Sequence, residues 1–183
     1  RSGGDFIPDE GRTAWGQTGD KWGGIERWEV EAEMNTAAKG LGNGTPIGLI
    51  GAKPEIADSF QGMAISTFGG NPGKSVTARA VIDIIEEDDL RTNAAVVGEY
   101  FRKKLEELQA KHPIIGDVRG MGLMQALELV EDRETKKPAP AGTNALMEEA
   151  RKRGLRVGQG GFYGKGIGMS PPWNIGKADG DGA

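Results

Sequence analysis

The amino-acid sequence predicts an α/β fold, because segments with helical and strand-like patterns alternate along its 183 residues. Two apolar stripes at helical spacing occupy residues 72–87 and the stretch that ends at His112-Pro113. Short apolar runs bounded by glycine and polar residues lie before and after them. Glycine is abundant, with 31 residues spread without a period, which favours many tight turns.

The first part of the chain is expected to end a strand, form a loop and begin a second strand. The expected elements are a strand end at 5–10, an ordered aromatic loop at 11–24 and a strand at 46–52. Pro8 favours an edge position for the first strand, and the Asn43-Gly44 turn introduces the second. Trp15 and Trp22 within the loop and Trp28 just after it are expected to pack it down.

The rest of the chain alternates between helices and strands, and the stretch after about Asp88 is expected to form a separate small domain. The expected elements are helices at 72–87, 94–111 and 143–153, strands at 114–118, 123–130 and 155–157, a surface loop at 131–142 and a frayed tail at 177–183.

The composition excludes several classes of protein. The net charge is -4 with acidic and basic residues interspersed, so no basic face suits nucleic acid. There are no cysteines and a single histidine, His112, which excludes disulfide frameworks and predicts no metal site. No apolar stretch approaches the length of a membrane span, and the first residues contain no apolar signal region. We therefore expect a soluble, cytoplasmic protein without a membrane or nucleic-acid partner.

Three segments could carry chemistry. Lys39 lies among small residues before a glycine-rich turn, where its amine would have room to attack an aldehyde. An ordinary solvent-exposed lysine in a turn would have the same sequence pattern. Asp9 ends a strand and could pair with a pyridinium nitrogen, or cap a turn. Thr67 lies in a hydroxyl- and glycine-rich segment that leads into a helix N-terminus, which suits either a phosphate site or an ordinary helix cap.

The three segments together contain the groups that pyridoxal 5'-phosphate (PLP) requires. Their sequences and their order along the chain are similar to those of the class III (omega-type) aminotransferases. The family's Asp-Glu-Val-Gln-Thr-Gly-Phe-Gly-Arg-Thr-Gly segment corresponds to residues 9–19. Its Ala-Lys-Gly-Leu-Gly-Asn-Gly segment is present unchanged at 38–44, followed by Pro-Ile-Gly at 46–48. Its Thr-Phe-Gly-Gly-Asn-Pro segment is present at 67–72, and residues 116–124 resemble the family's small-domain strand pair.

The resemblance implies a partial PLP-dependent transferase of fold type I, equivalent to the C-terminal half of a family member. Residues 1–88 would belong to the PLP-binding large domain and 89–183 to an incomplete small domain. Lys39 would be the Schiff-base lysine and the catalytic base, and Asp9 would face the ring nitrogen. Thr67 would reach the phosphate of the neighbouring subunit, which implies a homodimer. The activity would be amino transfer between an amino acid or amine and a 2-oxo acid.

Three departures from the family pattern keep a second function open. Arg12 and Gln17 stand where the family has Gln and Arg, and Gly168 stands where an Arg clamps the substrate carboxylate. Losing a bidentate clamp should weaken substrate positioning. The third departure is length, since family members are more than twice as long. The alternative is a truncated, non-catalytic homologue that acts at most as an association module.

Overall fold

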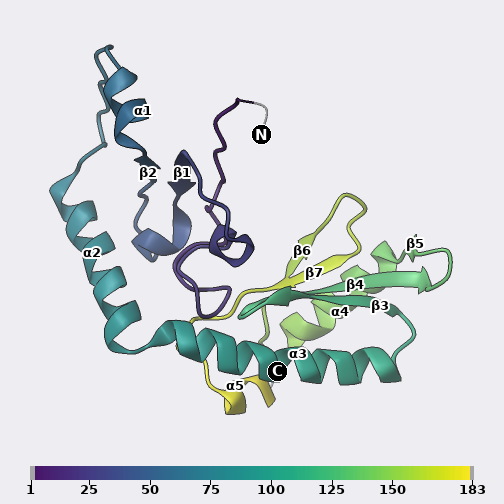
Figure 1. The fold of residues 1–183 in the computed structure, drawn as a ribbon. Coiled ribbons are helices and arrows are strands. Elements are labelled where there is room, and N and C mark those ends of the chain that lie inside the picture. The colour runs from purple at the N-terminus through teal and green to yellow at the C-terminus, as the bar shows by residue number, and fades with distance from the viewer. Residues whose placement is uncertain (1–2, 182–183) are drawn as a thin grey trace. The chain divides into compact units, whose positions relative to one another are not determined.

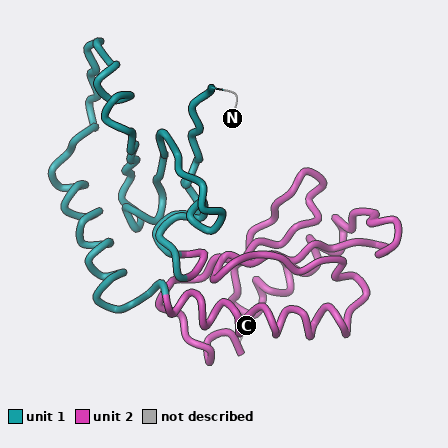
Figure 2. Tube along the Cα trace, viewed as in Figure 1, with its two compact units in different colours: residues 1–16, 20–91 teal, residues 17–19, 92–183 magenta. Residues whose placement is uncertain are grey.

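A computed structural model describes residues 3–181, which form two compact units. Unit 1 contains residues 3–16 and 20–91, and unit 2 contains residues 17–19 and 92–181. Figure 2 traces the two units in separate colours. Each unit has its own secondary structure and is described by itself.

Unit 1 is built around a two-stranded antiparallel sheet. It contains the 3-10 helices η1 (Ile25–Trp28) and η2 (Lys39–Gly42), the strands β1 (Met34–Ala37) and β2 (Leu49–Ala52), and the helices α1 (Pro54–Ser59) and α2 (Pro72–Glu87) (Figure 1). The two strands pair so that Ala37 lies opposite Leu49, and η2 lies in the connection between them. Leu41 in η2 is only 2% exposed and anchors this connection.

The N-terminal segment of unit 1 runs beside β1. The backbone N–H of Thr36 donates to the carbonyl of Pro8 at 3.1 Å, and the N–H of Glu10 donates to the carbonyl of Thr36 at 2.8 Å. Asp9 and Thr36 thereby form a parallel bridge. The strand end expected at 5–10 is therefore present as this single bridge.

Helix α2 has the bounds that the sequence predicts, and the residues of its first turn explain where it starts. Asn71 precedes the helix, and its side-chain oxygen accepts a hydrogen bond from the backbone N–H of Lys74 at 3.2 Å. Pro72 occupies the first turn, where its missing N–H has no helical partner to lose. The Asn-Pro pair therefore starts the helix at one defined residue.

Unit 2 is an antiparallel sheet with helices packed on one face. It contains most of α3 (Leu90–Lys111), then β3 (Ile115–Met121), β4 (Met124–Asp132), β5 (Lys137–Pro138), α4 (Pro140–Lys152), β6 (Gly158–Gly160), β7 (Gly166–Met169) and α5 (Lys177–Asp181). The strand order is β3-β4-β7-β6, and β5 pairs with β4. Leu105 of α3 and Leu146 of α4 pack on the same core as Leu127 and Ile167, so both helices cover one face.

The contact between α3 and the β3–β4 turn leaves no room for a side chain at Gly98. A Cβ atom there would lie 2.2 Å from the backbone oxygen of Gly122. Replacing a helical Gly with Ala normally stabilises a helix by about 1 kcal/mol. We expect Gly98→Ala to reverse that sign and lower the free energy of unfolding by about 2 kcal/mol, because two backbones must separate.

Urea unfolding of the variant measures this effect. The matched control is Gly73→Ala in α2, where a Cβ would approach nothing closer than the Asn71 side chain at 3.4 Å. An unfolding midpoint for Gly98→Ala equal to or above that of the parent chain would contradict the packing described here.

Several sequence expectations were wrong in detail. The loop expected at 131–142 contains β5 and the first turn of α4, because Pro140 starts the helix earlier than expected. The strand expected at 155–157 lies at 158–160, and the tail expected to fray forms α5 up to Asp181, with residues 182–183 outside the described part. Trp28 is 61% exposed and does not pack the aromatic loop as expected. The elements not expected at all are η1, β1, α1 and β7.

Candidate active site

Asp9 is held at the bridge between the N-terminal segment and β1. Its Oδ1 atom accepts a hydrogen bond from the backbone N–H of Gly11 at 2.9 Å and a longer one from the hydroxyl of Thr36 at 3.4 Å. Both of these bonds use the same carboxylate oxygen and orient the group. The side chain is exposed. A ligand can therefore reach this carboxylate.

Lys39 lies two residues after the end of β1 and begins η2 in a left-handed backbone conformation, with φ of 51°. This conformation costs a residue other than glycine roughly 1–2 kcal/mol, so the surrounding structure must impose it. The preceding carbonyl, on Ala38, accepts hydrogen bonds from the backbone N–H of Leu41 at 3.3 Å and from the indole N–H of Trp15 at 3.2 Å. These bonds fix the peptide plane that carries the lysine.

The amine of Lys39 and the carboxylate of Asp9 border one small space beside Gly11. A Cβ atom built on Gly11 would lie 2.9 Å from Lys39 Nζ and 2.9 Å from Asp9 Oδ1. The two groups therefore approach the same side of Gly11. An amine for an aldehyde and a carboxylate for a ring nitrogen are two of the groups that PLP requires, so Lys39 and Asp9 fit this cofactor.

A buried carboxylate holds the loop that follows Asp9. Glu10 is only 5% exposed and accepts hydrogen bonds from the backbone N–H groups of Gly24 at 2.9 Å and Ile25 at 2.7 Å. The hydroxyl of Thr13 donates to the same carboxylate. Hydrogen bonds to a buried charge are among the stronger ones in proteins. Glu10 thus closes the loop from Gly11 to Ile25 next to the candidate site.

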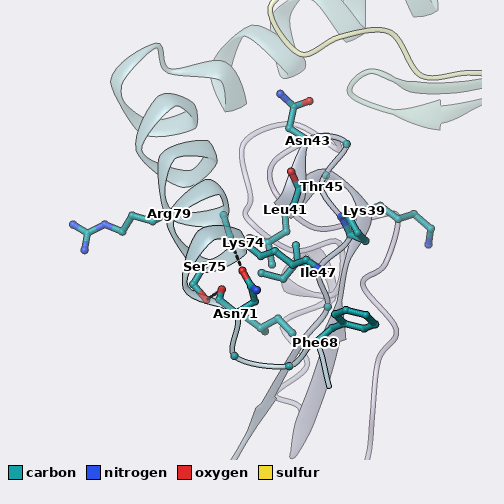
Figure 3. Close-up of a pocket in the computed structure, with 18 of the residues that line it drawn as sticks. Lys39, Leu41, Asn43, Thr45, Ile47, Phe68, Asn71, Lys74, Ser75 and Arg79 are labelled. Atoms are coloured by element: carbon teal, nitrogen blue, oxygen red, sulfur yellow. Dashed lines mark hydrogen bonds between the residues drawn. The ribbon is translucent and has the colours of Figure 1, made fainter. Parts of the chain in front are cut away.

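The segment that follows Lys39 lines a pocket together with residues of α2. The lining includes Gly40, Thr45, Phe68, Asn71, Lys74 and Ser75 (Figure 3). In Figure 3 the side chain of Lys39 points away from α2, so its amine does not enter this pocket. Thr67 lies outside the pocket lining on an exposed segment. The structure therefore brings Lys39 together with Asp9 but leaves Thr67 apart from both.

The sheet of unit 2 carries a charge network on the face opposite its helices. Glu128 alternates along β4 with buried leucines and pairs with Lys165 at 2.6 Å and Arg119 at 2.8 Å. The hydrogen bond from Lys165, followed by that from Arg119, lowers the pKa of Glu128. Because this pKa is lowered, ionised Glu128 stabilises the fold at any pH above the ordinary pKa of a glutamate. The stabilisation is lost as the pH falls through the lowered pKa of Glu128.

Gly168 lies on the same sheet, in β7, between Ala126 of β4 and Gly158 of β6. A Cβ atom there would meet only the carbonyl of Gly158, at 3.7 Å. The position therefore has room for a side chain but carries none. Arg12, the other departure, is exposed and lies in the loop closed by Glu10.

Sequence reasoning missed three residues that shape the candidate site. Gly11 lies beside both Asp9 and Lys39, Thr36 orients Asp9, and Trp15 contacts the backbone before Lys39 rather than only packing the loop. All three act through pairing between segments more than 20 residues apart, for which the local sequence contains no signal. Among residues 3–181 there is no cluster of three or more His, Asp or Glu side chains suited to a metal ion.

The fold and the site together define a class of protein. A lysine amine and a carboxylate that meet on an α/β frame are typical of enzymes that use an aldehyde cofactor. The family model described as "Aminotransferase class-III" matches residues 2–183. The chain belongs to the class III aminotransferase family, whose members are PLP-dependent enzymes. The α/β architecture is accordingly part of the PLP-dependent transferase fold.

Individual relatives agree with this assignment. The chain is 42% identical over 182 residues to alanine--glyoxylate aminotransferase 2 homolog 2, mitochondrial, from Arabidopsis thaliana, covering 99% of this chain and 38% of the relative. A phospholyase from Arthrobacter, solved in complex with phosphoethanolamine, superposes with a TM-score of 0.93 at 35% identity over 98% of this chain and 43% of that one. An amine transaminase from an uncultivated Pseudomonas species, solved in a PLP-bound form, gives a TM-score of 0.88 at 34% identity over 97% of this chain and 42% of that one.

The chain therefore spans about two-fifths of the length of these relatives. Among residues 3–181, no helix is both long and apolar enough to cross a membrane.

Proposed function

We propose that the chain is part of a PLP-dependent aminotransferase that moves an amino group between an amino acid or amine and a 2-oxo acid. The observation that carries the proposal is the convergence of Lys39 Nζ and Asp9 Oδ1 on the space beside Gly11. PLP supplies an aldehyde that takes up the amino group and a ring that accepts electron density from the reacting carbon.

Lys39, Asp9 and Thr67 would each have a separate role in this reaction. Lys39 would bind the cofactor covalently and, once released by the incoming amino group, would move a proton as a general base and acid. Asp9, oriented by Gly11 and Thr36, would hold a proton on the ring nitrogen. Thr67 would bind the phosphate of a cofactor in a neighbouring subunit.

A homodimer is part of the same proposal. The segment that contains Thr67 exposes four large apolar side chains of unit 1: Phe60 (64%), Met63 (87%), Ile65 (86%) and Phe68 (72%). Exposed apolar side chains gathered in one segment favour an interface. Sedimentation analysis is expected to show a dimer that the double variant Met63→Ser/Ile65→Ser dissociates. A monomeric parent chain would contradict the proposal.

The domain roles are proposed in the same way. Unit 1, with Asp9, Lys39 and Thr67, would be the C-terminal part of the PLP-binding large domain, and unit 2 would be the small domain. The proposed location is the cytoplasm. The Arabidopsis relative is named as a mitochondrial protein, so cell fractionation would decide between the two compartments.

One observation favours a second reaction, elimination of phosphate from a phosphorylated amine. Gly168 offers no cation where the family places its carboxylate-binding Arg, and phosphoethanolamine, the ligand of the Arthrobacter phospholyase, has no carboxylate. The same cofactor and the same lysine serve both reactions, since each begins with loss of a proton next to the bound amino group.

Parallel assays separate the two reactions. The chain with PLP is incubated with an amino acid and a 2-oxo acid, and separately with phosphoethanolamine. Formation of a new amino acid supports amino transfer, whereas release of inorganic phosphate supports elimination. Absence of both products would leave the non-catalytic association module as the function of this chain.

A further inference from the structure

We infer that Trp15 is a positioning residue for Lys39. Its indole N–H holds the carbonyl of Ala38 and thereby keeps the Lys39 amine beside Asp9. The inference rests on the proposed function, because the position of the Lys39 amine matters only if that amine binds an aldehyde cofactor.

The hydrogen bond acts on the peptide plane that sets the lysine backbone. Trp15 Nε1 donates to the Ala38 oxygen at 3.2 Å across 23 residues of sequence. The dihedral φ of Lys39 describes rotation about the bond that follows this peptide plane, so fixing the direction of the Ala38 carbonyl restricts φ. Lys39 has φ of 51°, a value that lysine rarely adopts without support.

With a negative φ, Lys39 would not place its amine beside Asp9. A change of φ to the usual negative range would rotate the Cβ atom and carry the amine away from the space beside Gly11. The backbone N–H of Leu41 also donates to the Ala38 carbonyl, at 3.3 Å, but it belongs to the same turn and moves with it. Trp15 is the contact that reaches this carbonyl from another segment of unit 1.

The loop that carries Trp15 is itself firmly attached. Glu10 binds the N–H groups of Gly24 and Ile25, and the N–H of Gly16 donates to the carbonyl of Trp22 at 3.2 Å. Trp15 has φ of 70°, so it too is held in a left-handed conformation. A rigid loop that presents an indole N–H is suited to fix a backbone carbonyl across the site.

The sequence pattern is consistent with a role specific to this chain. The family segment has Phe at this position, and a phenyl ring has no N–H to donate. Trp15→Phe therefore keeps an aromatic ring and removes the hydrogen bond. Replacement of Trp15 by its sulfur isostere, benzothienylalanine, removes the N–H alone and leaves the ring shape unchanged. The matched control is Trp22→Phe in the same loop, because the Trp22 ring faces Arg91 at 4.7 Å rather than Ala38.

Two readouts on the full chain test the inference. The first is amide hydrogen exchange by NMR. Without the indole N–H, we expect the Leu41 amide to exchange about three- to tenfold faster, the effect of losing one neutral hydrogen bond, while Gly24 and Ile25 remain unchanged. The second is the yield of PLP fixed on Lys39 by borohydride relative to Lys21, which we expect to fall by a similar factor in both Trp15 variants but not in Trp22→Phe.

The outcomes separate this inference from the proposed function. Unchanged Leu41 exchange in the Trp15 variants would overturn the inference, and so would equal acceleration at Gly24 and Ile25, which would mean that Trp15 only stabilises the loop. Fixation of PLP on Lys39 in the parent chain with no decrease in the variants would also overturn it, while the proposed function would stand. No fixation on Lys39 in the parent chain, with faster Leu41 exchange in the variants, would support the backbone contact and remove the proposed function.

Discussion

Replacing Lys39 with Ala is expected to lower the rate of amino transfer by about 10²- to 10⁴-fold, the range for loss of a positioned acid–base group. The variant loses both the covalent hold on the cofactor and the amine that moves the proton. Initial rates with a fixed donor and 2-oxo acid measure the effect. A small primary amine added to the solution should restore part of the rate, since it can transfer the same proton.

Lys21→Ala is the control for this substitution, because Lys21 is an exposed lysine of the loop that follows Asp9. Its rate should match that of the parent chain. An unchanged rate for Lys39→Ala would assign the proton transfer to another group and remove Lys39 from the site.

Asp9→Asn is expected to lower the same rate by about 10²- to 10³-fold, the typical effect of removing one preorganised electrostatic partner. The amide keeps an oxygen that can accept the hydrogen bonds from Gly11 and Thr36, so the local structure should persist. It has no negative charge with which to hold a proton on a ring nitrogen. The loss should therefore appear in the rate and not in the unfolding midpoint.

Asp5→Asn provides the matched control, as an exposed aspartate four residues earlier in the same segment. Equal rates for Asp9→Asn and Asp5→Asn would show that the ring nitrogen, if a cofactor binds, is not paired with Asp9.

Asp9 and Lys39 could be chosen as candidates from the sequence because the segments that contain them resemble those of the class III family. Their meeting beside Gly11 could not. It depends on pairing between Pro8, Glu10 and Thr36, and the hydrogen bond from Thr36 to Asp9 spans 27 residues. A bridge of this kind is set by tertiary structure and leaves no periodic pattern in either segment.

The helices were easier to predict than the glycine-rich strands. Helix α2 has a cap and a proline that fix its start, and a periodic stripe that marks its length. Strands β6 and β7 contain four glycines, Gly158, Gly160, Gly166 and Gly168, which carry little strand signal. The pairing of β7 with β4, the pairing of β6 with β7 and the burial of Ile167 place them in the sheet instead.

The most direct test of the proposed cofactor site is to reduce the chain with borohydride in the presence of PLP and to locate the cofactor by peptide mass analysis. The proposed site predicts that the label is concentrated on Lys39 and that this labelled peptide is absent from Lys39→Ala. A label spread evenly over exposed lysines, and equal in the two proteins, would mean that the amine beside Asp9 does not bind the cofactor.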